Sequence, residues 1–306
     1  MTRVAAVDIG TNSVRLLVAD VAGGADGTLV AVDRRMRITR LGEGVDATHQ
    51  LAPAAIERTL DVLHEYRDAI AGDAVTTVRA TATSAARDAT NRDEFFAAAR
   101  DALGTAPELL SGDEEGRLSF HGATAGLADE PPPYLVVDIG GGSTELAVGT
   151  TAPEAAVSVD VGCVRITEAY LHSDPPAAEE LSQAVSVVRD ELADATRGLP
   201  GLGDVKTAVG LAGTITTIAA VEQGVPYSRD AIHGFCLTRA AAEDVFRTLA
   251  LEPAAERRHN PGLEPGRVDT IVGGAVVLVT VLRGLELDEL LVSEDDILDG
   301  LARSLA

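Results

Sequence analysis

One motif occurs twice in this chain, as Asp8-Ile9-Gly10-Thr11-Asn12-Ser13 and, 130 positions later, as Asp138-Ile139-Gly140-Gly141-Gly142-Ser143. An apolar run precedes each copy and a second apolar run follows it. This order predicts a strand, a tight glycine turn and another strand, used twice. Two unrelated hairpins with glycine turns are the alternative. The apolar runs are residues 4–7, 14–19, 134–137 and 146–148.

Each turn has the composition of a phosphate-binding loop. Glycine and hydroxyl residues expose backbone N–H groups that can surround phosphate oxygens. The leading carboxylates, Asp8 and Asp138, stand where they could hold a cation beside that phosphate. We therefore expect two similar domains that face each other across a phosphate-binding cleft.

The charge of the chain restricts its ligands. The 306 residues suffice for two domains with full cores, and they carry 48 acidic against 25 basic side chains, a net charge of −23. Nucleic acid requires a basic face, and no charge run supplies one. The overall field repels a phosphorylated ligand, so its site must be locally basic. With a single lysine, Lys206, that charge must come from arginine, backbone N–H groups and metal.

The cysteines and the apolar runs point to an ordinary globular protein. Cys163 and Cys236 lie far apart in apolar contexts, and we expect both to be buried structural thiols. The N-terminus enters a strand directly, so we expect no signal peptide. The longest apolar run, residues 273–282, is too short to cross a bilayer. We therefore expect a cytoplasmic protein that binds neither nucleic acid nor membrane.

Each half of the chain opens with a β-meander and then alternates helix and strand, which predicts an α/β duplicate. Asn91 is the expected N-cap of one helix, with Glu94 completing a capping box. The proline-rich stretch 128–133 is the strongest linker signal. We therefore predict domains at 1–127 and 128–306, with the last helix able to pack back towards the first domain. The predicted strands are 4–8, 14–20, 29–37, 75–80, 108–111, 154–161, 207–211 and 289–292, besides the second hairpin, and the predicted helices are 53–71, 91–103, 113–127, 177–197, 214–223, 238–250, 267–285 and 295–305.

Three further segments could carry chemistry. The acidic residues of the segment 111–117 open a helix, where the macrodipole alone favours them. Alternatively, one of these carboxylates accepts a proton from water that attacks a phosphate. The Ser/Thr-rich turn 80–87 ends in Arg87, whose guanidinium can offer a fork of donors to phosphate. The turn 210–214 joins a strand to a helix and presents N–H groups. Among six scattered histidines, His233 lies in a glycine loop and has the best claim to a functional role.

In combination, these residues resemble the exopolyphosphatase / guanosine pentaphosphate phosphatase (Ppx/GppA) family. The similarity covers essentially the whole chain. It implies two ribonuclease-H-like lobes of the actin–hexokinase–Hsp70 superfamily, with hydrolysis in an interlobe active-site cleft. The segments that carry it are residues 8–16, 80–87, 111–117, 138–146, 161–165, 210–214 and 261–269.

The resemblance also implies roles for individual residues. The family's catalytic glutamate is the second of an acidic pair directly before a small residue, which here is Glu115, before Gly116. Mg²⁺, with Mn²⁺ as the alternative, would be held by Asp8, Asp138 and Glu145. The residues expected to bind the substrate are Thr11, Asn12, Ser13, Arg87, Gly140, Gly141, Gly142, Ser143, Gly213 and Thr214.

The leading hypothesis is an exopolyphosphatase that removes the terminal phosphate of inorganic polyphosphate. Longer members of the family carry a C-terminal helical domain, and we expect this chain to be a short form, which favours short polyphosphates. The rivals are the same hydrolysis of guanosine pentaphosphate, a non-catalytic sensor of polyphosphate or alarmone, and an actin-like kinase. The resemblance further implies a homodimer. The sequence does not decide between the two substrates, or fix chain-length preference, metal preference or inhibition by alarmones.

Overall fold

The computed structural model describes residues 1–23, 27–127 and 129–305, and it divides the chain into two compact units. Unit 1 comprises Met1–Gly126 and Asp295–Ala306, and unit 2 comprises Leu127–Glu294. The last helix, which was expected to be able to pack back towards the first domain, is part of unit 1. The sequence also predicts a glycine turn at residues 23–27. Part of that turn, and the first residue of the predicted linker, lie outside the described residues.

Unit 1 is built on a five-stranded sheet with the order β3-β2-β1-β4-β5. Strands β1, β2 and β3 are antiparallel neighbours, whereas β4 runs parallel to β1 and β5 parallel to β4. The elements of unit 1 are β1 Thr2–Ile9, β2 Ser13–Ala22, β3 Thr28–Ile38, α1 Val45–Thr48, α2 Pro53–Gly72, β4 Thr77–Ala82, α3 Ser84–Asp88, α4 Arg92–Leu103, β5 Glu108–Leu109, α5 Gly112–Thr124 and α13 Ile297–Arg303.

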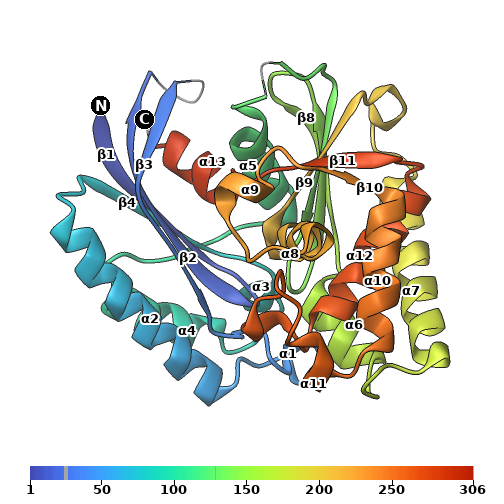
Figure 1. Cartoon of the computed structure of the whole chain (residues 1–306). Helices are drawn as coiled ribbons and strands as arrows, with labels where there is room; N and C mark the ends of the chain where they lie inside the picture. The colour runs from blue at the N-terminus through green and yellow to red at the C-terminus, as the bar shows by residue number, and fades with distance from the viewer. Residues whose placement is uncertain (24–26, 128, 306) are drawn as a thin grey trace. The chain divides into compact units, whose positions relative to one another are not determined.

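Helices cover both faces of this sheet, which explains why β1 is apolar at consecutive positions. Val7 packs in the core that α2 and α4 complete. Val4 and Ala6 point to the opposite face, where Leu301 of α13 joins them. Figure 1 shows α13, drawn in red, beside the blue strands of the N-terminal half. The C-terminal helix thus packs on the face of the first sheet opposite α2 and α4.

Unit 2 repeats this design with one strand more, in the order β10-β11-β9-β6-β7-β8. Its first three strands are again antiparallel, β9 is parallel to β6, and β11 is parallel to β9. The elements of unit 2 are β6 Tyr134–Ile139, β7 Thr144–Gly149, β8 Pro153–Val159, α6 Cys163–Tyr170, α7 Ala178–Thr196, η1 Leu202–Asp204, β9 Thr207–Leu211, α8 Ala212–Gln223, α9 Arg229–Ile232, β10 Cys236–Thr238, α10 Arg239–Leu251, α11 Ala254–Arg257, η2 Pro265–Arg267, α12 Ile271–Gly284 and β11 Glu289–Val292.

The shared strand order confirms the predicted α/β fold with two ribonuclease-H-like lobes. Both predicted hairpins form, as β1–β2 and β6–β7. Helix α12 begins at Ile271 and not at residue 267, because Pro265 opens a separate 3₁₀ turn, Pro265–Arg267. The short helices α6, α9 and α11 and the strand β10 were not predicted.

Two local predictions are wrong. Asn91 lies at the N-cap of α4, but its side chain makes no capping bond. It accepts from the backbone N–H of Leu51 at 2.9 Å and donates to the carbonyl of Leu51 at 3.0 Å, which fastens two distant segments. Cys236 is exposed on β10, whereas Cys163 is buried as expected.

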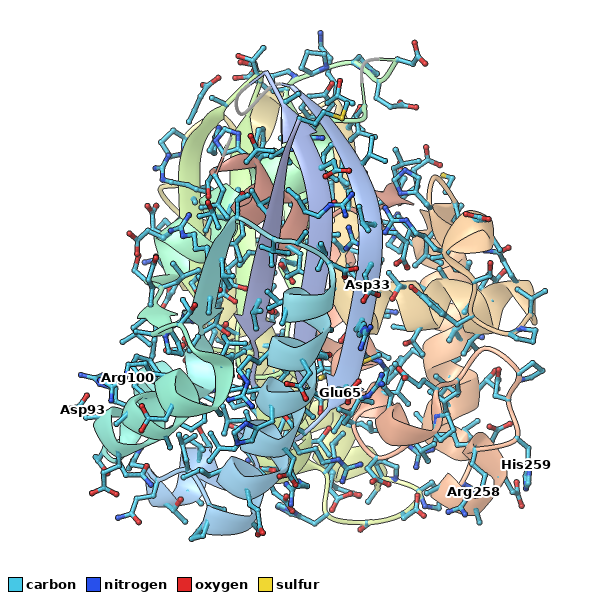
Figure 2. The ribbon with its side chains drawn as sticks, turned by 90° about the vertical axis from the view of Figure 1, so that its left-hand side faces the viewer. Asp33, Glu65, Asp93, Arg100, Arg258 and His259 are labelled. Carbon is cyan, nitrogen blue, oxygen red and sulfur yellow. The ribbon has the colours of Figure 1, made fainter. Side chains whose placement is uncertain are left out.

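Many charged side chains at the surface of unit 1 are engaged with near neighbours. Figure 2 labels Asp33 on β3, Glu65 on α2, and both Asp93 and Arg100 on α4. Arg35 lies 2.7 Å from Asp33 and 3.7 Å from Glu65. Exposed pairs of this kind contribute little to stability, but they occupy arginines that would otherwise enlarge a basic surface.

Within the described residues, no helix combines the length and the apolar character that crossing a membrane requires.

Candidate active site

The predicted site residues fall into two half-sites, one in each unit. We call residues 8–13 the first loop and residues 138–143 the second loop. The same hydrogen bond closes both turns: the N–H of Gly10 donates to the carbonyl of Ser13 at 3.0 Å, and the N–H of Gly140 donates to that of Ser143 at 3.0 Å. The two loops therefore have one backbone design.

The segment 39–44 and the helix α3 hold the first loop in place. The N–H groups of Arg40 and Gly42 donate to the carbonyls of Asn12 and Thr11, at 2.9 and 2.8 Å. The Thr11 hydroxyl accepts from the N–H of Ala85 at the start of α3, at 3.2 Å. A Cβ atom at Gly42 would lie 2.2 Å from Thr11 Cγ2, so this close approach requires glycine.

Asn12 presents the strongest local sign of a binding function. Its side chain is buried, and neither Nδ2 nor Oδ1 has a hydrogen-bond partner among the residues that the structure describes. Buried amide groups are almost always hydrogen-bonded in folded proteins. The arrangement therefore suits a polar ligand at Asn12, in agreement with its predicted role in substrate binding.

Asp8 is buried at the end of β1 and is bound by an arginine. Arg15, opposite it on β2, donates through Nη2 to Asp8 Oδ2 at 2.7 Å and also contacts Asp296, the N-cap of α13. Burial raises the pKa of Asp8, while the charge of Arg15 opposes that shift. Sequence reasoning assigned no role to Arg15, although it stands seven residues after Asp8, as Glu145 stands after Asp138.

Glu115, the expected catalytic residue, and Arg87, an expected substrate-binding residue, meet in unit 1. Arg87 Nη1 lies 2.7 Å from Glu115 Oε2 and 3.1 Å from the carbonyl oxygen of Leu110. Their side chains are 20% and 12% exposed, so the pair is only partly screened by water. Helix α5 contributes the carboxylate and the short helix α3 contributes the guanidinium.

The neighbouring acidic residues of α5 have other partners. Glu114 closes a capping box with Ser111, whose backbone N–H donates to Glu114 Oε2 at 2.9 Å. These hydrogen bonds lower the pKa of Glu114. Asp113 pairs with Arg117 one turn on, at 2.8 Å. Helix capping therefore accounts for Glu114, whereas Glu115 is directed to Arg87.

Helix α6 holds the second loop through its first N–H groups. The N–H of Cys163 donates to the carbonyl of Gly140 at 3.0 Å, and the N–H of Val164 donates to that of Gly141 at 2.8 Å. Arg165 adds a bond from Nε to the carbonyl of Gly142 at 2.9 Å. A Cβ atom at Gly162 would lie 2.5 Å from the backbone of Gly141. The second loop is therefore supported on its carbonyl side by a helix that the sequence analysis did not predict.

Asp138 and Glu145 stand opposite each other on β6 and β7. Both are buried, with 6% and 1% of their surface exposed, and Glu145 Oε1 accepts from the hydroxyl of Ser158 at 2.7 Å. Side chains at such positions are direct neighbours. Two buried carboxylates side by side offer oxygen ligands of the kind that Mg²⁺ prefers. Among the described residues no group of three or more His, Cys, Asp or Glu forms a metal-binding cluster.

The turn 210–214 forms the other part of the half-site in unit 2. Ala212 opens α8 with a φ of 68°, in the left-handed region that alanine rarely adopts. A Cβ atom at Gly213 would lie 2.1 Å from Arg267 Nη2, so the guanidinium of Arg267 covers this turn. Arg267 is itself held by Glu264 at 3.0 Å. Arg267 lies in a segment that carries the family resemblance, but the sequence analysis gave it no role.

His233 makes a hydrogen bond to the backbone. Its Nδ1 accepts from the backbone N–H of Glu294 at 3.1 Å, which fixes the chain between β11 and α13.

Comparisons with known proteins identify the family of this chain. The sequence profile of the Ppx/GppA phosphatase family matches residues 17–305. A Mycobacterium tuberculosis protein named exopolyphosphatase 2 is 47% identical over 320 aligned positions, covering 100% of this chain and 99% of that protein. The crystal structure of an exopolyphosphatase-like protein shares 38% identity, with a TM-score of 0.93 and 98% of both chains covered. That of the Aquifex aeolicus member of the Ppx/GppA family shares 35% identity, with a TM-score of 0.82, covering 99% of this chain and 97% of the other. The chain belongs to the Ppx/GppA phosphatase family.

Proposed function

We propose that this protein is an exopolyphosphatase, a hydrolase that cleaves the terminal phosphoanhydride bond of inorganic polyphosphate and releases orthophosphate. The observation that carries the proposal is the pair Arg87–Glu115, in which a carboxylate not needed for helix capping faces a guanidinium. The full-length similarity to a protein named exopolyphosphatase 2 supports the choice of substrate.

Glu115 is the proposed general base. Its carboxylate accepts a proton from the water that attacks the terminal phosphorus, and no covalent intermediate on the protein is required. Arg87 orients that carboxylate through Nη1, and its planar fork of five donors suits the oxygens of the terminal phosphate. In each unit the N–H groups of the loop, with Asn12 in unit 1, offer donors to phosphate oxygens.

The buried carboxylates of the half-sites are suitable ligands for Mg²⁺. Asp138 and Glu145 would hold it, since they supply buried oxygen ligands of like charge on adjacent strands. Asp8 was expected to join them, and its Oδ1 is buried without a hydrogen-bond partner among the described residues, but its Oδ2 already accepts two hydrogen bonds from Arg15. When bound, Mg²⁺ neutralises the charge of the phosphates. Mn²⁺ is the alternative ion.

Hydrolysis of guanosine pentaphosphate is the second candidate function. The matched family is defined by both phosphatases, and the residues that face the terminal phosphate serve either substrate. This activity would connect the protein to the stringent response. We further propose a cytoplasmic homodimer, which the family resemblance supports.

The test is phosphate release by the purified protein with Mg²⁺ from short polyphosphate, long polyphosphate and guanosine pentaphosphate. Release from short polyphosphate that disappears in Glu115→Gln supports the proposal. Release from guanosine pentaphosphate alone would replace the first function by the second. Tight binding of polyphosphate without release would identify a sensor.

A further inference from the structure

The two loops differ at one equivalent position. Asp8 pairs across its hairpin with Arg15, and Asp138 pairs across its hairpin with Glu145. Each partner stands seven residues after its aspartate. The turns are closed by the same Gly-to-Ser hydrogen bond. The duplicated hairpins therefore place a guanidinium in unit 1 where they place a carboxylate in unit 2.

Arg15 is tightly engaged at this position. Its Nε and Nη2 donate to the same oxygen, Asp8 Oδ2, at 3.2 and 2.7 Å. Its Nη1 donates to Asp296 Oδ2 at the N-cap of α13. The side chain of Asp8 is 3% exposed and that of Arg15 is 20% exposed, so the contact is largely shielded from water.

A second arginine extends the cluster. Arg34 of β3 lies 2.7 Å from Asp299 and 3.8 Å from Asp296. Three aspartates and two arginines thus form one cluster within unit 1, in which each arginine contacts two carboxylates or lies near a second one. In unit 2, the corresponding hairpin brings two carboxylates together.

We propose that Arg15 is the built-in cation of the first loop: it occupies the place of a divalent metal beside Asp8, keeps Asp8 out of the metal site, and leaves Asp138 and Glu145 as the metal ligands. The inference rests on the proposed function and deepens it. It revises the predicted metal set, in which Asp8 was an equal member. Arg15 is then a positioning residue for the first loop.

Electrostatics supports this division. A buried carboxylate requires a counter-charge, and Asp8 already receives one from Arg15 at hydrogen-bonding distance. A divalent ion that approached Asp8 would be repelled by the guanidinium, which stays charged at any accessible pH. Oδ1 of Asp8 then remains an acceptor for water and not a metal ligand. A separate bond from Arg15, to Asp296, ties the loop to α13, because Asp296 is the N-cap of that helix.

The test is Mn²⁺ binding to the full-length, metal-free protein, followed by electron spin resonance without any substrate. We expect one Mn²⁺ per chain in the wild type. Glu145→Gln should weaken binding by about tenfold or more, whereas Asp8→Asn should change the affinity by less than about twofold. Arg15→Glu recreates in unit 1 the carboxylate pair of unit 2, and it should bind a second Mn²⁺. Arg15→Lys keeps the cation and should bind only one.

Loss of Mn²⁺ affinity in Asp8→Asn equal to that in Glu145→Gln would overturn the inference. A wild type that binds no Mn²⁺ would also overturn it, because the carboxylates of unit 2 are required to hold the ion. Circular dichroism of each variant separates unfolding from loss of the site, and Asp8→Asn, which retains the shape of the side chain, is the decisive variant. Polyphosphate hydrolysis is not part of this readout. A protein with the expected binding pattern and no hydrolysis would refute the proposed function and leave the inference intact.

Discussion

Glu114 and Glu115 are adjacent and chemically identical, yet they have different partners. Glu114 caps α5 through Ser111, whereas Glu115 faces Arg87. The sequence alone gave the helix macrodipole as one explanation of both residues, and only the family resemblance selected Glu115. The structure supplies the physical distinction, because a side chain that closes a capping box is not available to activate water.

Glu115→Gln should therefore lower kcat by roughly 10²- to 10⁴-fold, since the amide cannot accept the proton of the attacking water. Glu114→Gln is the matched control: it should leave kcat nearly unchanged and cost about 1 kcal/mol of stability or less through the weakened cap. Steady-state kinetics and thermal unfolding of both variants test this pair. Near-normal turnover in Glu115→Gln would exclude it as the base.

Arg87 allows a second prediction at the residue scale. Arg87→Lys retains the positive charge but loses the planar fork that binds two oxygens at once. We expect a lower kcat/KM by about tenfold or more, because the substitution removes a charge-assisted hydrogen bond of roughly 1.5–3 kcal/mol. Arg100→Lys, on the surface of α4, is the control and should behave like the wild type. Equal kinetics in the two variants would argue against contact between Arg87 and substrate.

At the scale of the element, both hairpins were predictable because their apolar runs and glycine turns are local in sequence. The failures arose where the partner is distant. Asn91 has the residue type and spacing of a helix cap, but a side-chain bond to Leu51, 40 positions away, takes its place. Helix α6 is only eight residues long and follows a glycine, so its apolar pattern is too short to identify. The hydrogen bonds from α6 to the second loop could be identified only from the structure.

The contact between α6 and the second loop gives the third prediction. Gly162→Ala would place Cβ 2.5 Å from the backbone of Gly141, so either the loop or α6 must move. We expect about 1–3 kcal/mol of destabilisation together with a higher KM for polyphosphate. Gly203→Ala is the control, since a Cβ there meets no atom within 4 Å. Thermal unfolding and kinetics of both proteins provide the measurement. A Gly162→Ala protein with normal stability and KM would show that this approach is not required.

At the scale of the whole molecule, the C-terminal segment completes the first unit. The linker signal at 128–133 predicted the boundary near residue 127 because its composition is local. The sequence allowed the last helix to pack back towards the first domain, but the extent of the segment that does so, Asp295–Ala306, depends on packing between residues far apart in the chain. Gly300 of α13 approaches Leu118 of α5, where a Cβ would lie 2.1 Å from the carbonyl oxygen. Helix α13 therefore supports the helix that carries Glu115.

Gly300→Ala should consequently destabilise unit 1 by about 1–3 kcal/mol. The expected loss of Tm is about 2–4 °C for each kcal/mol. Gly72→Ala at the end of α2 is the matched control, because a Cβ at Gly72 meets no atom within 4 Å. Differential scanning calorimetry of the two variants compares them directly. Equal Tm values would contradict the assignment of a tight contact between α13 and α5.

The central claim is hydrolysis of polyphosphate by a water that Glu115 activates. The most direct measurement is orthophosphate release from short polyphosphate by the wild type, Glu115→Gln and Glu114→Gln under identical conditions with Mg²⁺. We predict release by the wild type and by Glu114→Gln, and a loss of roughly 10²-fold or more in Glu115→Gln. Equal rates in all three proteins, or release that requires ATP and an acceptor as in a kinase, would contradict the account.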